Sequence, residues 1–240
     1  MRRMRASLAG VGLGLTGLIV LALAGPMYRI GLPLGMAFTL LRFAAYIGLA
    51  AVAVGLGVAA WHLKKGARLA AGVAVLGVVG GLVATGIPWS WQRRAQRLPL
   101  IHDISTDLEN PPAFVKAVAL RDGSPNGLDR GADVTLQQRQ GYPDLAPLTL
   151  AEPSGQVLAR ARATAERLGW EIVSVDERAG LIEATDTSRW FGFVDDVAVR
   201  ITPWGTGARV DLRSVSRVGL SDVGANADRI RAFLAALQEP

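Results

Sequence analysis

The first part of the chain is dominated by long runs of apolar residues that are interrupted by few polar side chains. Three such stretches stand out, at about residues 7–25, 38–60 and 67–87. Each approaches or exceeds the roughly 20 residues that a helix needs to cross about 30 Å of hydrocarbon. Tryptophans, whose amphipathic rings favour the headgroup level of a bilayer, follow the second and third stretches: Trp61, Trp89 and Trp91. The pattern predicts a transmembrane region of three helices within residues 1–91.

Beyond residue 153 the apolar positions recur with the periods of a soluble α+β domain. A helical stripe runs over about residues 154–168, and a second stripe predicts a final helix from about residue 222 or 225 to 237. Between them, runs of period two predict strands at about residues 171–176, 180–187, 193–202 and 208–216. Because the breaks between the runs are short, antiparallel hairpins are favoured. We therefore expect a core at residues 154–240, with a four-stranded or slightly larger antiparallel sheet in α-β-β-β-β-α order and helices on one face.

The segment between these regions, residues 92–153, reads as a linker and a loop-rich entry to the soluble domain. It begins with a basic exit from the membrane, continues through an ordered loop or short extended segment at residues 101–114, and has no clear apolar period at residues 121–147. We expect residues 121–147 to form a long excursion over the surface.

Charge divides the chain in the same place. Residues 1–98 contain 11 Lys and Arg and no Asp or Glu, whereas residues 99–240 contain 15 Lys and Arg against 20 Asp and Glu, a net charge of −5. A negatively charged soluble domain argues against nucleic-acid binding, which requires a basic face. The bilayer is therefore the first partner that the sequence predicts.

The distribution of Lys and Arg also predicts an orientation. Six basic residues flank the N-terminus and the second connection: Arg2, Arg3, Arg5, Lys64, Lys65 and Arg68. The positive-inside rule places this side in the cytoplasm, so three spans leave the C-terminal domain outside. We expect a multi-pass protein of a bacterial inner membrane with a periplasmic domain. The cluster Arg93, Arg94 and Arg97 on the opposite side weakens the bias.

Two features of the apolar stretches leave alternatives open. Ala22-Leu23-Ala24 before Gly25 resembles a signal-peptide cleavage site, so the first stretch is either a span or a removed leader. Small residues spaced four apart, Gly10 with Gly14 and Gly77 with Gly81, let helix backbones approach closely. They serve packing among the chain's own helices or contacts in a homo-oligomer.

Several separated strings in the soluble half resemble a known family. HDISTD with NPP (residues 102–112), YPDLAPL (142–148), GFVDDVAVR (192–200) and RSVSRVGLSDVGANADRIRAFL (213–234) follow one another in order. Together they are similar to the domain-of-unknown-function family 1499. The resemblance implies a bacterial or plastid protein that is often tied to a membrane, and it implies no reaction.

Candidate catalytic groups are few because the chain has no cysteine and only two histidines. His102 and Asp103, if they met Asp195 and Asp222, could supply a general base or hold a hard cation. The alternative is a polar network that fixes the entry segment to the sheet. No metal site or cofactor is predicted.

A second set of polar residues surrounds the start of the last helix. Arginines beside a helix N-terminus can bind an anion such as a lipid phosphate, although ion pairing with nearby aspartates explains them equally. Ser221 does not stand in a G-x-S-x-G motif, which argues against a serine nucleophile. The ligand-binding candidates are Arg213, Ser214, Ser216, Arg217, Ser221, Asn226 and Arg229.

These observations favour a non-catalytic function. We expect a membrane-anchored domain that binds a ligand, an anionic lipid or a protein partner in the bacterial envelope. The alternative is an envelope hydrolase that uses His102 and nearby carboxylates.

Overall fold

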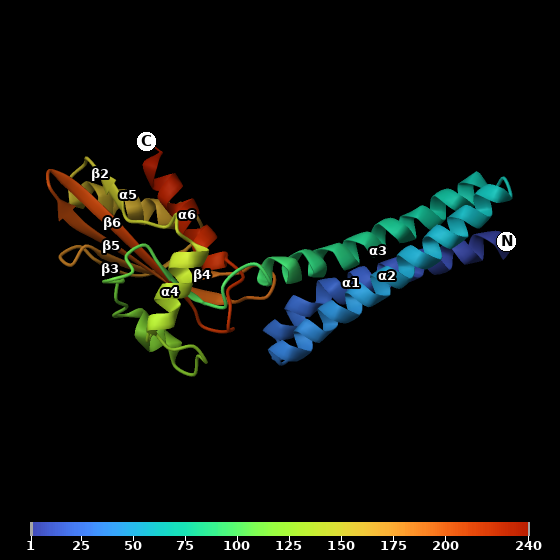
Figure 1. The fold of residues 1–240 in the computed structure, drawn as a ribbon, viewed down its shortest axis with the longest axis horizontal. Coiled ribbons are helices and arrows are strands. Elements are labelled where there is room, and N and C mark those ends of the chain that lie inside the picture. The colour runs from blue at the N-terminus through green and yellow to red at the C-terminus, as the bar shows by residue number, and fades with distance from the viewer. Residues whose placement is uncertain (1, 240) are drawn as a thin grey trace. The chain divides into compact units, whose positions relative to one another are not determined.

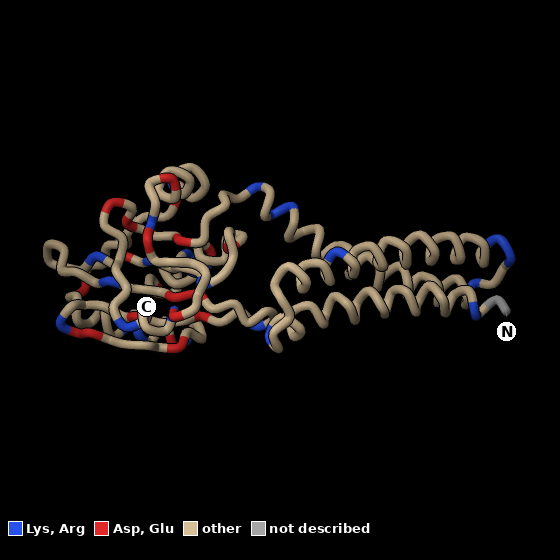
Figure 2. Tube along the Cα trace, turned by 90° about the horizontal axis from the view of Figure 1, so that it is seen from below, with Lys and Arg blue, Asp and Glu red and all other residues tan. Residues whose placement is uncertain are grey.

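The computed structural model describes residues 2–239 and divides into two compact units. One unit, here called the helical unit, holds the residues up to Arg94 together with Trp190–Gly192. The other, the sheet unit, holds Ala95–Arg189 and the residues from Phe193 onward. Acidic residues are confined to the sheet unit, whereas Lys and Arg cluster at the helix ends of the helical unit (Figure 2).

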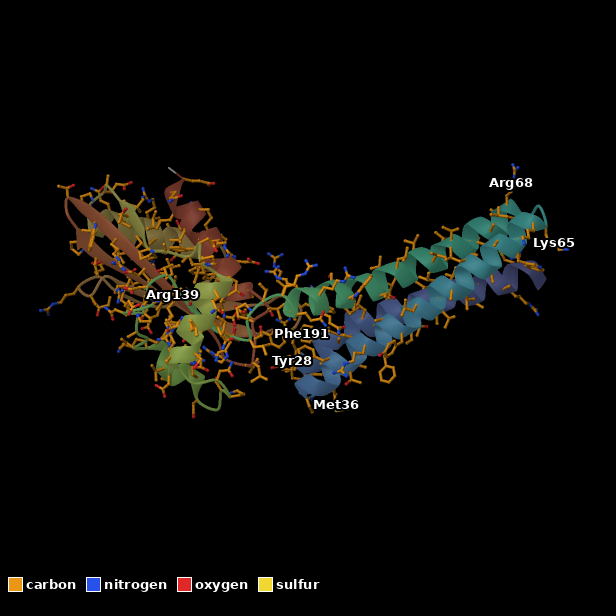
Figure 3. All side chains as sticks on the ribbon, in the orientation of Figure 1. Tyr28, Met36, Lys65, Arg68, Arg139 and Phe191 are labelled. Carbon is orange, nitrogen blue, oxygen red and sulfur yellow. The ribbon has the colours of Figure 1, made fainter. Side chains whose placement is uncertain are left out.

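The helical unit is built from three long helices that lie side by side (Figure 1). They are α1 (Arg2–Arg29), α2 (Leu34–Lys64) and α3 (Arg68–Ala95). All three are long and apolar enough to cross a membrane, with a mean hydropathy of 2.1 in each. Lys65 and Arg68 lie at the turn between α2 and α3, and Tyr28 and Met36 lie at the other end of the unit (Figure 3). The prediction of three apolar helices is confirmed, and each helix extends into its polar flanks.

Glycines bring the three helices into backbone contact. A Cβ atom added to Gly77 would lie 2.5 Å from the carbonyl of Gly10, and one added to Gly81 would lie 2.5 Å from the carbonyl oxygen of Gly48. At Gly14 the nearest atom, the carbonyl oxygen of Gly77, would be 2.8 Å away. Among the described residues, the glycines spaced four apart therefore pack against other helices of the same chain.

The helical unit also contains a tripeptide from far along the chain, Trp190–Gly192. The indole nitrogen of Trp190 donates a hydrogen bond of 3.1 Å to the carbonyl of Ala22, and its ring lies 5.2 Å from that of Trp91. Phe191 is buried, with its ring 6.0 Å from that of Tyr28. These aromatic contacts attach the tripeptide to α1 and α3 at the end marked by Tyr28 (Figure 3).

The sheet unit contains a six-stranded antiparallel sheet, where the core pattern predicts four strands or slightly more. Its elements are β1 (Asp103–Ser105), the 3-10 helix η1 (Ala117–Arg121), α4 (Ala132–Gly141), β2 (Leu148–Leu150), α5 (Ser154–Arg167), β3 (Glu171–Asp176), β4 (Leu181–Thr187), β5 (Val194–Trp204), β6 (Gly207–Ser216) and α6 (Ala225–Gln238). The order across the sheet is β1-β6-β5-β4-β3, and β2 also pairs with β6. The expected α-β-β-β-β-α order is wrong for the unit as a whole, because β1, η1, α4 and β2 precede it. The two added strands have three residues each, too few to show a period of two.

Helices α5 and α6 cover one face of the sheet and bury its main core. Val197 and Val199 of β5 and Leu212 of β6 are fully buried with Phe233 of α6. The ring of Phe233 stacks on that of Trp170 at 5.0 Å. The expectation that helices pack on this face is confirmed.

The opposite face is covered by residues 106–130, which include η1. A small core forms there from Phe114, Ala117, Ala198 and Val215. The carboxylate of Glu183, almost fully buried, accepts hydrogen bonds from the backbone N–H groups of Val115 (2.7 Å), Lys116 (2.8 Å) and Ala117 (3.1 Å). The surface excursion expected at residues 121–147 contains a helix that was not predicted, α4, whose Gln138 is buried and bonded to the backbone of Ser105.

Candidate functional site

The strand register places the candidate residues on two opposite faces of the sheet. Asp195 pairs with Ser216 and Asp196 pairs with Val215 across β5 and β6. Since successive side chains of a strand point to opposite faces, Asp195, Ser214 and Ser216 share the face covered by helices. The side chains of Asp196 and Arg213 share the other face.

On the helix-covered face, Arg229 is the centre of a buried polar network, here called the Arg229 cluster. Its Nε donates to Asp186 at 2.7 Å, its Nη2 to Asp195 at 2.6 Å and its Nη1 to the hydroxyl of Ser214 at 3.0 Å. Burial alone would lower the pKa of Arg229, but attraction to Asp195 and Asp186 outweighs it and the pKa is raised. The arginine is therefore held charged inside the domain.

Asn226 completes this cluster and links it to the entry segment. It is fully buried, and its Oδ1 accepts the hydroxyl of Ser214 at 2.7 Å. Its Nδ2 donates to Ser216 Oγ and to the carbonyl of His102, both at 3.0 Å. His102 thus joins the cluster through its backbone. Among the described residues, its imidazole forms no hydrogen bond.

Asp222 closes the turn that begins α6. Its two carboxylate oxygens accept the backbone N–H groups of Gly224 (2.9 Å) and Asn226 (2.7 Å), as an N-terminal capping residue does. Burial raises the pKa of Asp222, and this outweighs the two backbone hydrogen bonds, which lower it. Ser221 accepts the N–H of Val223 at 3.1 Å and donates to the carbonyl of Pro99 at 3.4 Å.

On the opposite face, two aspartates each hold two arginines. Asp103 accepts Nε and Nη2 of Arg213 at 3.1 and 2.7 Å and Nη1 of Arg130 at 3.0 Å. We call these three residues the Asp103 cluster. Desolvation by burial lowers the pKa of Arg130 although Asp103 attracts its charge.

Asp196, fully buried, is the second of these aspartates. It is bonded to Arg121 and accepts Nη2 and Nε of Arg217 at 2.8 and 3.0 Å. The hydrogen bond to Asp196 raises the pKa of Arg217. Asp107 and Asp211 share Arg200 and Arg209 in a third network on the same face.

The structure therefore separates residues that the sequence left open as one site. Asp195, Ser214, Ser216, Asn226 and Arg229 lie together, and Ser221 and Asp222 stand at the adjoining helix start. Asp103, Arg213 and Arg217 lie on the other face.

The sequence reasoning missed partners that complete these networks: Arg121, Arg130, Asp107, Glu183 and Asp186. Two arginines and one aspartate of this set come from residues 106–130, which carry no periodic signal. The available clue was one face of β5 and β6, where three arginines stand against two aspartates: Arg200, Arg209 and Arg213 against Asp196 and Asp211.

The chemistry of these clusters is that of fixed, paired charges. A carboxylate that is bonded to a guanidinium group is stabilised in its ionised form, which weakens it as a general base. Within residues 2–239, no group of three or more His, Asp or Glu side chains is arranged to hold a metal ion. Such paired charges are suited to holding the fold of the sheet unit together rather than to transferring protons.

A family model described as "Protein of unknown function (DUF1499)" matches residues 103–237 of the chain. The match begins with β1 and ends in α6, so it includes both clusters and none of the three apolar helices. A comparison with curated proteins finds no match.

Proposed function

Because the chain belongs to the DUF1499 family of proteins of unknown function, we propose a function from its geometry. We propose that it is a multi-pass protein of a bacterial inner membrane whose sheet unit lies on the extracytoplasmic side. There the sheet unit binds an envelope ligand or partner and catalyses no reaction.

One observation carries the non-catalytic part of this proposal: the candidate catalytic carboxylates are engaged by the protein itself. Asp195 is paired with Arg229, Asp103 with two arginines, and Asp222 with two backbone N–H groups. Removing a catalytic group leaves stability largely intact, whereas removing one partner of a buried pair leaves an uncompensated charge. Asp195 and Asp103 are partners in buried charge pairs and therefore fit the second case.

The location part is supported by the basic flanks of the helices. The start of α1 and the α2–α3 turn, with Lys64, Lys65 and Arg68 in or beside it, lie at one end of the helical unit (Figure 1). The positive-inside rule favours the cytoplasmic side for this end of the helices. Because the chain then crosses the membrane three times, the sheet unit that follows α3 lies on the opposite side.

Reporter fusions at the C-terminus test the location. Alkaline phosphatase is active only outside the cytoplasm, whereas green fluorescent protein folds inside it. We expect an active phosphatase fusion and a dark fluorescent fusion for the full chain. A fusion placed after Lys65, in the α2–α3 turn, is the matched control and should behave in the opposite way. Fluorescence of the C-terminal fusion would refute the proposed side.

Native mass spectrometry of the chain, extracted from the membrane with its surrounding lipid, tests the binding role. We expect a retained ligand or partner that adds a defined mass to the chain. A chain that carries no added mass, together with turnover of an envelope substrate that is abolished by Asp195→Asn, would favour the hydrolase instead.

A further inference from the structure

The sheet has one end at which the entry segment, the termini of four strands and the start of α6 meet. Strands β1 and β5 begin there and β4 and β6 end there, as the pairs Asp103 with Val215, Asp195 with Ser216 and Thr187 with Val194 show. We call this the proximal end of the sheet unit.

A loop at the proximal end holds an apolar side chain out in solvent. Leu220, in the loop of residues 217–224, is 81% exposed. Its neighbours are anchored: the carbonyl of Gly219 accepts Asn126 Nδ2 at 2.9 Å, and the N–H of Asp222 donates to the carbonyl of Ile101 at 3.2 Å. The position of Leu220 is therefore set by the surrounding structure.

The same loop contains an unfavourable backbone conformation. Val223 has a φ of 52°, the one positive value among the described residues other than glycine, and β-branched residues rarely adopt it. Hydrogen bonds from Val223 to Ser221 and from Gly224 to Asp222 maintain the turn. A strained backbone conformation persists only where surrounding contacts hold it in place, and it often marks a functional segment.

The proximal end carries exposed arginines, although residues 99–240 are net negative. Arg97 and Arg189 are exposed, and the side chain of Arg217 is 19% exposed. Two carboxylates that lie here, Asp195 and Asp222, are directed into hydrogen bonds within the domain, and Asp186 is paired with Arg229 although its side chain is 31% exposed. The proximal end therefore presents leucine and arginine to solvent, together with Glu171 at the start of β3.

Chain length keeps a second exposed leucine close to the last apolar helix. Leu100 is 68% exposed and follows Ala95, the last residue of α3, by five positions. Five extended residues reach at most about 18 Å. The carbonyl of Pro99, next to Leu100, accepts the hydroxyl of Ser221, so the Leu220 loop is tied to the same short segment.

We propose that the proximal end is a membrane-contact surface that recognises the anionic headgroups of phospholipids. Arg97, Arg189 and Arg217 attract the phosphates, and Leu100 and Leu220 enter the interfacial layer. Basic residues beside a membrane are drawn to anionic lipid within a Debye length. This surface gives the proposed function a partner, the anionic phospholipid. It rests on the proposed function because it requires the three helices to span the bilayer.

The far end of the sheet provides a matched control. The turn between β5 and β6 exposes Trp204 by 57%, with the guanidinium of Arg209 over its ring at 5.7 Å. It has a comparable apolar side chain and a nearby cation, but no short covalent link to α3. Contact with the bilayer is expected at the proximal end alone.

Hydrogen exchange of the full chain in lipid nanodiscs tests the proposal. Discs of phosphatidylcholine alone are compared with discs of equal parts phosphatidylcholine and phosphatidylglycerol. In the anionic discs, we expect amides of residues 217–224 to exchange about fivefold or more slowly for each engaged cation, and high salt should remove the difference. Peptides around Trp204 should be unchanged.

Variants separate lipid contact from folding. Leu220→Asp and the double variant Arg97→Gln/Arg189→Gln change exposed side chains, so the chain should fold while the difference between discs disappears. Trp204→Ser should retain it. Equal exchange in both discs, or a difference that survives Leu220→Asp, would overturn the proposal. Failure of the wild-type chain to enter discs of either composition would instead refute the membrane-spanning function on which it rests.

Discussion

The helical unit and the sheet unit are each closely packed, but different interactions hold them together. In the helical unit, Gly48 and Gly81 let two backbones meet. In the sheet unit, Asp103 and Asp196 each bind two arginines beneath residues 106–130, here called the covering segment. The first kind of packing depends on side-chain volume. The second depends on charge, and therefore on pH and on the presence of every partner.

This difference bears on what the polar residues of the sheet unit do. Charged side chains are rare inside proteins unless they are paired, and unpaired ones are costly. The sheet unit buries several carboxylates, and its covering segment is attached to the sheet mainly by them. Of the candidate catalytic carboxylates, Asp103 takes part in this attachment through Arg130, whereas Asp195 is paired with Arg229 on the other face.

The largest effect is expected from Asp103→Ala. It leaves Arg213 and Arg130 buried without their carboxylate, and breaking a buried pair in this way costs about 3–5 kcal/mol. Urea unfolding of the full chain in detergent, followed by hydrogen exchange in β1 and β6, measures the loss. The control is Glu109→Ala, which removes an exposed pair with Arg139 and should cost at most about 1 kcal/mol. Equal effects of the two substitutions would remove the distinction between buried and exposed charge.

An intermediate effect is expected from Gly81→Ala in the helical unit. The added methyl group meets a backbone oxygen at 2.5 Å, so α2 and α3 must separate, at a cost of about 1–3 kcal/mol. Thermal unfolding in detergent, monitored by the helical circular dichroism signal, reports the loss. Gly57→Ala is the control, because nothing lies within 4 Å of its added Cβ, and it should be neutral or stabilising by up to about 1 kcal/mol. If both variants behave alike, close packing of α2 on α3 is not what these glycines provide.

The smallest effect concerns pH and Asp222. Burial raises the pKa of Asp222 above 3.8, so between 3.8 and the raised value the folded chain binds more protons than the unfolded chain. Stability from this group therefore falls as pH rises through that window. Asp222→Asn cannot titrate, and the free-energy difference between wild type and variant should shrink with rising pH in urea unfolding experiments.

The control for this pH effect has the opposite sign. The hydrogen bond from Arg231 lowers the pKa of Asp144 below 3.8, so its contribution is present above 3.8 and is lost as pH falls below it. For Asp144→Asn, the difference from wild type should grow with rising pH up to about 3.8. The same trend in both variants would contradict the assigned causes.

The sequence predicted well what its periodicity records. The four long strands and α5 and α6 are found within a few residues of their expected positions, because their apolar residues alternate or recur at helical spacing. The face shared by Asp196, Arg213 and Asp211 also follows from strand parity alone.

What could not be predicted depends on contacts between distant residues. Strands β1 and β2 are short and gain their partners only from β6. The covering segment is fixed by the carboxylate of Glu183, which lies about 70 positions away in the sequence, and no local pattern records that contact. The candidate polar residues were identified by type, but the place of Asp103 beside Arg213 needed the pairing of β1 with β6.

The central claim, that the Arg229 cluster supports the fold, is tested most directly by a double-mutant cycle of Asp195→Ala and Arg229→Met. The free energy of unfolding is measured for wild type, both single variants and the double variant. If the pair is structural, the double variant is less destabilised than the two single variants summed, with a coupling of about 1–3 kcal/mol. Effects that add within about 0.5 kcal/mol, in variants that fold as stably as wild type, would contradict the account.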